Sequence, residues 1–294
     1  MYSQIDKNKR KTWLVMAMFF VIIAIIGALV GYLSDDFSVT WIMLGISAIY
    51  ALIQYFFASK MAIMMSGARE VDRQSAPRLY HVVETLTITT GLPMPKIYVI
   101  DDSSPNAFAT GRDPEHAAVA ATTGLIEMMD ERELTGVIAH EMAHIGNYDI
   151  RVSLVALALT AAIGFMSDMI LRGFRFSSSR DRDNRSGGGL GMVLLLIVAV
   201  LAPIMATLIQ LAVSRKREYL ADATASLTTR DPEGLARALE KLRDDRQPMR
   251  KFNSSMANMY IKNPIKKGFA SSLFSTHPPI EERIKILRGM EGQF

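Results

Sequence analysis

The residues with the clearest chemical potential are His140 and His144, four positions apart, with Glu141 directly after the first. On a helix, residues i and i+4 lie on one face, so both imidazoles can reach the same metal ion. Glu141 points to a different angle and can act on a water molecule beside that ion. This His-Glu-x-x-His pattern typically supplies two zinc ligands and a general base. Chance predicts only about 0.004 such motifs in a chain with five histidines, which disfavours two unrelated surface histidines.

A catalytic zinc needs a third protein ligand and one open coordination position. One known continuation of the motif would place Gly at 147 and His at 150, but Asn147 and Ile150 stand there. The best remaining candidates lie in SRKREYLADATA (214–225), where Glu218 and Asp222 are again four residues apart. Glu218 can bind zinc while Asp222 accepts an N–H from a ligand histidine. On spacing alone, a juxtamembrane helix with ordinary solvated charges explains this stretch equally well.

The helix that carries the motif is expected to begin in water. The segment DERELTGVIAHEMAHIG opens with four charged residues, 130–133. Asp130 is a predicted N-cap, Glu133 completes a capping box, and an apolar face follows. An intramembrane protease would instead embed the motif in an apolar span, so the sequence disfavours that class.

The other soluble elements are expected to be mainly helical, with a few short strands. Capping residues and apolar periodicity predict the helices, and short apolar or β-branched runs predict the strands. The expected helices cover 77–90, 231–245 and the end of 275–290, and the expected strands cover 95–101 and 117–124.

Four long apolar runs predict that the chain is a membrane protein. Residues 13–33 and 37–59 carry no charge, 152–171 carries only Asp168, and 190–213 is uncharged. About 20 residues suffice for a helix to span the hydrocarbon core, whereas buried core helices suit runs of about 10–14. The first run exceeds the apolar region of a signal peptide and no small-residue cleavage site follows, so we expect an anchor.

Basic residues predict the orientation of the first two runs. DKNKRK (6–11) precedes the first run, SDD (34–36) between the runs has no Lys or Arg, and Lys60, Arg69 and Arg73 follow the second. The positive-inside rule therefore places the N-terminus and the residues after the second run in the cytoplasm.

The last two runs leave the topology open. Their linker, 172–189, holds five arginines, which disfavours an external position, so these runs either cross the bilayer or only dip into it. Both possibilities put His140 and the residues from 215 onward in one compartment. We therefore expect a tail and transmembrane hairpin at 1–60, two parts of a cytoplasmic protease domain at 61–151 and 214–294, and the last two runs at 152–213.

The composition excludes several classes of function. The chain has 294 residues and no cysteine, so it has neither disulfides nor thiolate metal ligands, which fits a cytoplasmic domain. Its net charge is only +4, and no basic patch is interleaved with aromatic residues. We therefore interpret the Lys and Arg beside the apolar runs as topology signals, and expect no nucleic-acid partner.

Four motifs, in this order and after two N-terminal spans, carry a family resemblance. They are PNAFATG (105–111), HEMAH (140–144), SRKREYLADATA (214–225) and STHP (275–278). Together they resemble the HtpX-type membrane zinc metalloproteases, relatives of the CAAX prenyl proteases, over nearly the whole chain. The resemblance implies a mainly α integral membrane protein. Its fold would be a gluzincin-like zinc protease domain with a small β-sheet and two to four transmembrane helices.

The resemblance also implies roles for individual residues. His140, His144 and Glu218 would bind one Zn²⁺ per subunit, and Glu141 would be the catalytic base. Asp222 would hold a ligand histidine through a hydrogen bond.

Three further residues would meet the substrate. His277 would stabilise the oxyanion, although without the resemblance it is an ordinary histidine in a proline turn. Asn106 and Ala107 would lie on an edge strand that receives the substrate backbone, a usual way to hold an extended peptide.

The function implied is a zinc endopeptidase of the bacterial inner membrane, with its active site facing the cytoplasm. It would cleave misfolded or damaged membrane proteins during stress. Its other expected partners are the lipid bilayer and other membrane quality-control proteases. One alternative is a prenyl-protein processing enzyme, although such relatives usually have more spans. The other is a non-catalytic, zinc-stabilised membrane protein such as a scaffold or transporter. Inverted repeats, which are typical of transporters, are not evident.

Overall fold

The computed structural model describes residues 2–159, 161, 215–250, 254–262, 264 and 278–292. The chain divides into two compact units. We call Met1–Arg10, Phe57–Leu154 and Val213–Phe294 the sheet unit, and Lys11–Phe56 with Val155–Ala212 the hairpin unit. Most of the predicted runs at 152–171 and 190–213, their linker, and His277 lie outside the described residues.

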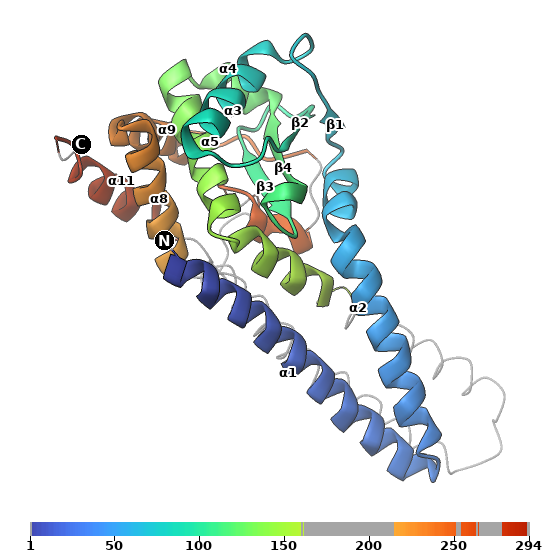
Figure 1. Ribbon diagram of the computed structural model, residues 1–294. Helices are drawn as coiled ribbons and strands as arrows, with labels where there is room; N and C mark the ends of the chain where they lie inside the picture. The colour runs from blue at the N-terminus through green and yellow to red at the C-terminus, as the bar shows by residue number, and fades with distance from the viewer. Residues whose placement is uncertain are drawn as a thin grey trace. The chain divides into compact units, whose positions relative to one another are not determined.

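Two long N-terminal helices, α1 (Tyr2–Ser34) and α2 (Ser38–Met65), cover the first two predicted spans. Among the described residues, these are the helices long and apolar enough to cross a membrane, over Ile5–Leu29 and Thr40–Met65. The bounds differ from the predicted 13–33 and 37–59 because α1 continues through the basic segment before the first apolar run, and α2 continues beyond the second run to Met65. The basic segment is therefore helical up to Tyr2 (Figure 1).

Close packing at a small-residue contact joins the two helices within the hairpin unit. Thr40 Oγ1 donates to the carbonyl of Gly27 at 2.8 Å, and a Cβ added at Gly27 would lie 3.1 Å from Thr40 Cα. Large aromatic side chains face outward, with Trp13 and Trp41 exposed by 68% and 74%. Such exposure suits contact with lipid better than contact with water.

The sheet unit contains a four-stranded sheet in the order β1-β2-β4-β3. The strands are β1 (Arg69–Glu70), β2 (Lys96–Ile100), β3 (Ala107–Gly111) and β4 (Ala117–Thr122). β2 pairs parallel with β4, and β3 pairs antiparallel with β4. Both predicted strands are confirmed, although the second ends earlier, because Thr122 caps the short helix α4 (Thr123–Met128). β3 is an edge strand, as the resemblance implied.

Helices make up most of the rest of the described sheet unit. Those that the sequence predicted are confirmed, with α5 beginning at its predicted capping box of Asp130 and Glu133 and α9 capped by Asp231. The helices are α3 (Pro77–Thr90), α5 (Glu131–Gly146), α8 (Arg215–Thr229), α9 (Pro232–Asp244) and α11 (Ile280–Arg288), with 3-10 turns η1 (Pro114–His116) and η2 (Ser254–Met259).

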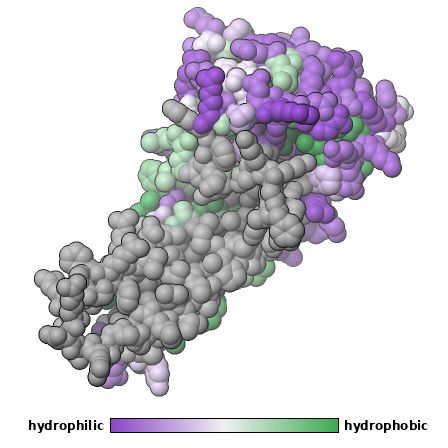
Figure 2. Space-filling view, turned by 180° about the vertical axis from the view of Figure 1, so that it is seen from behind, coloured by the Kyte–Doolittle hydropathy of each residue, from purple (hydrophilic) through white to green (hydrophobic). Residues whose placement is uncertain are grey.

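Helix α5 lies at the centre of the sheet unit and packs against α3, α8, α9 and β3. Its fully buried Leu134 and Ile138 belong to one apolar core with residues such as Val119 of β4. The α5–α9 contact is close, because a Cβ added at Gly136 would lie 2.8 Å from the backbone nitrogen of Leu235. Figure 2 shows that the surface of the sheet unit is mostly hydrophilic on the face drawn. The central helix is thus buried within a unit whose drawn face is mostly hydrophilic.

Candidate metal centre

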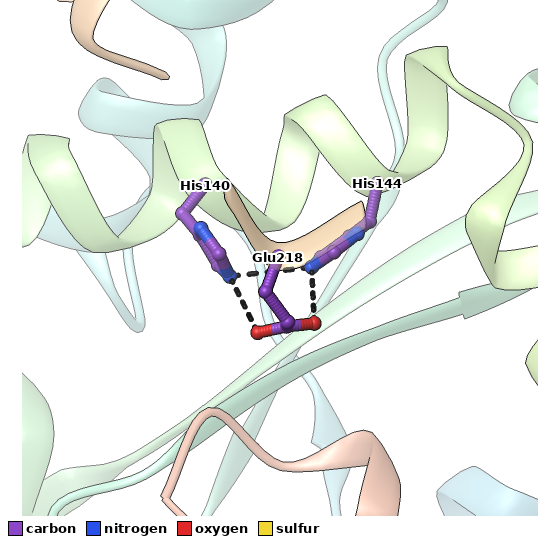
Figure 3. A group of neighbouring side chains, drawn as sticks. All are labelled: His140, His144 and Glu218. Carbon is purple, nitrogen blue, oxygen red and sulfur yellow. Dashed lines mark hydrogen bonds and ion pairs between the residues drawn. The ribbon is translucent and has the colours of Figure 1, made fainter. Parts of the chain in front are cut away.

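The motif histidines and Glu218 converge on one point inside the sheet unit. His140 and His144 project from adjacent turns of α5, and Glu218 projects from the first turn of α8 (Figure 3). The two Nε2 atoms lie 3.2 Å apart. Glu218 places Oε1 at 3.5 Å from His144 Nε2 and Oε2 at 3.8 Å from His140 Nε2. The structure therefore brings together the three residues that the sequence proposed as ligands.

These separations fit a tetrahedral metal ion. Ligand atoms at the usual zinc distances of about 2.0–2.1 Å lie about 3.3 Å from one another around a tetrahedron. All three donor atoms fall within 4.8 Å of one another. Two imidazole nitrogens and one carboxylate oxygen form a known donor set of catalytic zinc, which leaves one position open.

A carboxylate holds the far nitrogen of each histidine. His140 Nδ1 lies 2.9 Å from Asp222 Oδ1, and His144 Nδ1 lies 3.0 Å from Asp149 Oδ2. An imidazole that donates from Nδ1 presents the lone pair of Nε2, and it presents it in a fixed direction. Both rings are thus set to bind a cation with the nitrogen that faces Glu218.

Asp222 accepts from a motif histidine, as the sequence suggested, whereas the contact of Asp149 was not predicted. Asp149 lies five residues after His144, beyond the end of α5, and returns toward it because Tyr148 adopts a left-handed backbone conformation with φ 59°. A carboxylate so soon after the motif is the only sequence signal of this contact. The turn at Tyr148, which brings Asp149 back to His144, has no clear signature in the local sequence.

Arg283 of α11 is a second residue that the sequence did not identify. It is fully buried and grips Asp222 with two bonds, Nε to Oδ2 at 2.8 Å and Nη2 to Oδ1 at 2.6 Å. Burial alone would raise the pKa of Asp222, but Arg283 and the bond to His140 lower it to about 2. Asp222 therefore stays charged at neutral pH and keeps accepting the His140 N–H.

Glu141 is the buried acid beside the ligands, with 3% of its surface exposed. Burial raises the pKa of its carboxyl above the ordinary value, while the two histidines and a backbone hydrogen bond from Ala109 of β3 act in the opposite direction. A raised pKa suits a group that must accept a proton and later release it.

The centre as a whole carries negative charge that favours a cation. Burial lowers the pKa of His144, but the bond to Asp149 and the carboxylates of Glu218 and Glu141 outweigh it and raise this pKa to about 9. A group of acids that holds a proton this firmly on an imidazole also attracts a divalent ion. The electrostatics and the donor geometry thus indicate the same kind of occupant.

Asn106 and Ala107 lie at the start of the edge strand, where the chain's own residues 261 and 262 engage them. The Asn106 amide donates to the carbonyl of Lys262 at 2.7 Å and accepts from its N–H at 3.1 Å. The carbonyl of Ala107 accepts from the N–H of Ile261 at 3.0 Å. A contact with substrate remains a prediction for both residues.

Comparisons with known proteins point in the same direction. A family model described as Peptidase family M48 matches residues 73–291. The chain is 51% identical to a Protease HtpX homolog of Tropheryma whipplei (strain Twist), covering 100% of both chains. It is 47% identical to a Protease HtpX homolog of Streptococcus gordonii, covering 99% of this chain and 100% of the relative. The crystal structure of S. mikatae Ste24p is similar in fold, with TM-score 0.53 and 21% identity over 98% of this chain and 67% of that chain.

These matches confirm the resemblance that the four sequence motifs carried. The family match at 73–291 spans both motif histidines and Glu218, and the similarity to the HtpX relatives runs the length of the chain. The chain therefore belongs to peptidase family M48 and is a metalloprotease of the HtpX group.

Proposed function

We propose that this metalloprotease uses one Zn²⁺ bound by His140, His144 and Glu218. The observation that carries the proposal is the convergence of two Nε2 atoms and one carboxylate at separations of 3.2–3.8 Å. Zinc prefers this mixed nitrogen and oxygen set, and a three-ligand site leaves room for water. When bound, zinc supplies a Lewis acid that activates water and polarises the scissile carbonyl.

The residues of the chain perform the remaining steps. Glu141 accepts a proton from the attacking water on its buried carboxylate and delivers it to the leaving amine. Asp222 and Asp149 keep the two ligand imidazoles oriented by holding their Nδ1–H groups. His277 is proposed to donate a hydrogen bond to the oxyanion as it develops.

We propose that the substrate adds as a strand to the edge of β3 that faces away from β4. Main-chain hydrogen bonds hold an extended peptide without regard to its sequence, which suits a protease with many substrates. Because Ile261 already occupies the carbonyl of Ala107, the peptide would pair with the strand beyond that residue. Asn106 would then define one end of the binding edge by fixing residues 261 and 262 there.

The proposed substrates are membrane proteins that are misfolded or damaged, cut at the cytoplasmic face of the bacterial inner membrane. The two helices that are long and apolar enough to cross a membrane, together with the protease relatives, support this proposal. The basic segment 6–11 within the first turns of α1 and the acidic turn after this helix favour a cytoplasmic N-terminus and sheet unit. The full protease domain would comprise 61–151 and 214–294, with residues 152–213 at or in the membrane.

The substitution Glu141→Gln tests the catalytic assignment. The amide keeps the size of the side chain but cannot take up a proton, so the variant should retain zinc and lose at least about 10²-fold in rate. Zinc is measured by elemental analysis of the purified full-length protein, and rate by cleavage of a model membrane protein. Wild-type cleavage by the zinc-loaded variant would refute the role of Glu141.

Removal of the metal provides the matching control. Proteolysis by the wild type should stop with a chelator and return when zinc is added back. A protein that holds zinc yet cuts nothing under these conditions would indicate a structural, non-catalytic site.

A second candidate function is the processing of prenylated proteins, and the fold likeness to Ste24p is the observation that favours it. The reaction would be the same, with a lipidated peptide as substrate. Cleavage of a farnesylated peptide in preference to its unmodified twin would support this candidate. Equal cleavage of both would support the broader endopeptidase.

A further inference from the structure

The N-terminal turns of α1 contact the loop that follows the motif helix. The Asn8 side chain is buried, with 5% exposure. Its Nδ2 lies 2.7 Å from the carbonyl oxygen of Asn147 and 2.8 Å from Asp149 Oδ1. An amide nitrogen has two hydrogens, so Asn8 can donate to both acceptors at once. These residues all belong to the sheet unit.

A neighbouring contact reinforces this attachment. The ammonium of Lys9 lies 4.7 Å from the centre of the Tyr148 ring, a distance at which a cation and an aromatic face attract each other. Tyr148 is the residue with the left-handed backbone that turns the chain back toward His144. Asn8 and Lys9 thus hold all three residues of the turn, 147–149.

Asp149 connects this attachment to the metal centre. Its Oδ1 accepts from Asn8, while its Oδ2 lies 3.0 Å from His144 Nδ1. The guanidinium of Arg217 also faces this carboxylate, with Nη1 3.5 Å from Oδ1. Fixing one carboxylate oxygen fixes the other, so the Asn8 bond, together with Arg217, positions the oxygen that accepts from the His144 N–H.

We infer that Asn8 is a positioning residue for the metal centre. Through Asp149 it holds His144 in the orientation that presents Nε2 to the cation. Asn8 therefore has a positioning role, although the segment that contains it was interpreted from the sequence only as a topology signal. This inference rests on the proposed function, since it needs His144 to be a metal ligand.

The test measures the zinc affinity of the full-length protein in detergent, by competition with a chelator of known affinity. Loss of a group that orients a ligand histidine typically weakens metal binding by about 10–100-fold. Asn8 acts one bond further away, so Asn8→Ala should weaken binding by about tenfold. Asn8→Asp has the same size but replaces the donor with an acceptor facing Asp149, and should weaken it at least as much.

Two controls separate this role from others. Lys7→Ala changes an exposed neighbour on the same helix and should bind zinc like the wild type. Asp149→Ala removes both acceptor oxygens and should be the weakest binder. Thermal unfolding of each metal-free protein shows that the fold is retained, and Asn8→Asp preserves the packing should Asn8→Ala lose it.

The outcomes are distinct. Wild-type zinc affinity in Asn8→Asp, with one zinc bound by the wild type, overturns the positioning role and leaves the proposed function intact. A wild type that binds no zinc refutes the proposed function itself.

Discussion

At the scale of single residues, a buried ion pair of Arg283 and Asp222 supports the proposed ligand His140. Both side chains are buried, with 1% exposure each, and two hydrogen bonds join them. Arg283 also lies 3.6 Å from Glu218 Oε2. Burying two charges is costly, but removing one partner costs more, because the other is left without compensation. The pair thus holds α8 and α11 together beside His140.

We predict that Arg283→Met destabilises the protein by about 3–5 kcal/mol, as expected for one broken partner of a buried pair. Arg283 is the main cause that lowers the pKa of Asp222 to about 2 against the effect of burial. Without Arg283, the buried Asp222 carboxylate loses its cation and its pKa should rise. Thermal or denaturant unfolding of the detergent-solubilised protein measures the change.

Two variants serve as comparisons for this prediction. Arg288→Met removes a half-exposed arginine from the same helix and should have little effect, because surface ion pairs contribute little. The double variant Arg283→Met with Asp222→Asn should recover part of the loss by removing the carboxylate that has lost its cation. Equal stability of the Arg283 and Arg288 variants would contradict the assigned importance of the buried pair.

At the scale of elements, the site depends on how α5 is held. Its N-terminus is fixed by the capping box of Asp130 and Glu133, and its middle crosses α9 at Gly136. A Cβ there would lie 2.8 Å from Leu235 N and 2.9 Å from Leu235 Cα. Since backbone cannot move aside as a flexible side chain can, the close crossing requires glycine.

We predict that Gly136→Ala costs about 1–3 kcal/mol, the usual range for overpacking a core. The added methyl group should push α5 and α9 apart. Because α5 carries both proposed ligand histidines, its shift should also lower zinc occupancy. Gly146→Ala, at the end of the same helix, is the matched control, since its Cβ would meet only Leu92 at an ordinary 3.5 Å. Unfolding temperatures and zinc content measure both effects, and equal behaviour of the two variants would refute the steric argument.

Local signals made most of the helices predictable from sequence. Asp130 with Glu133, and Asp231 with its following proline, announce α5 and α9 within four residues of chain. The short β3 was not predictable from its residues alone, because AFATG is mostly small and does not alternate between polar and apolar. Its identity as a strand depends on pairing with β4.

The candidate site divides in the same way. His140, Glu141 and His144 are specified by one turn of helix, so spacing predicted them. Glu218 required the family resemblance, and Asp149 and Arg283 were missed. A contact between α8 and α11 joins residues far apart in sequence, and no local pattern encodes which buried arginine meets which carboxylate.

At the scale of the whole molecule, the apolar helices have dimensions that match a bilayer. Exposed Trp13 and Tyr32 lie near the two ends of the apolar part of α1. The two residues are 19 positions apart, which is a rise of about 28 Å at 1.5 Å per residue, close to the hydrocarbon thickness of about 30 Å. Aromatic residues commonly mark both membrane interfaces.

We predict opposite sides of the membrane for the hairpin turn and the sheet unit. The chain has no cysteine, so a single introduced thiol reports its own accessibility. In intact bacterial cells without an outer membrane, an impermeant maleimide should label Phe37→Cys at the turn but not Gln74→Cys in the sheet unit. Both positions are exposed, so both should react after the membrane is opened. Labelling of Gln74→Cys in intact cells would reverse the proposed orientation.

The order of the site residues along the chain has a consequence for biosynthesis. Glu218 follows His144 by 74 residues, and Arg283 follows it by 139. At about 5–20 residues per second, a ribosome needs about 7–28 s to reach the last of them. During that interval the growing chain carries the motif helix without its proposed third ligand and then without the arginine behind it. On the proposed ligand set, a growing chain therefore has no complete metal centre until Glu218 has been translated, and Asp222 lacks its arginine until α11 follows.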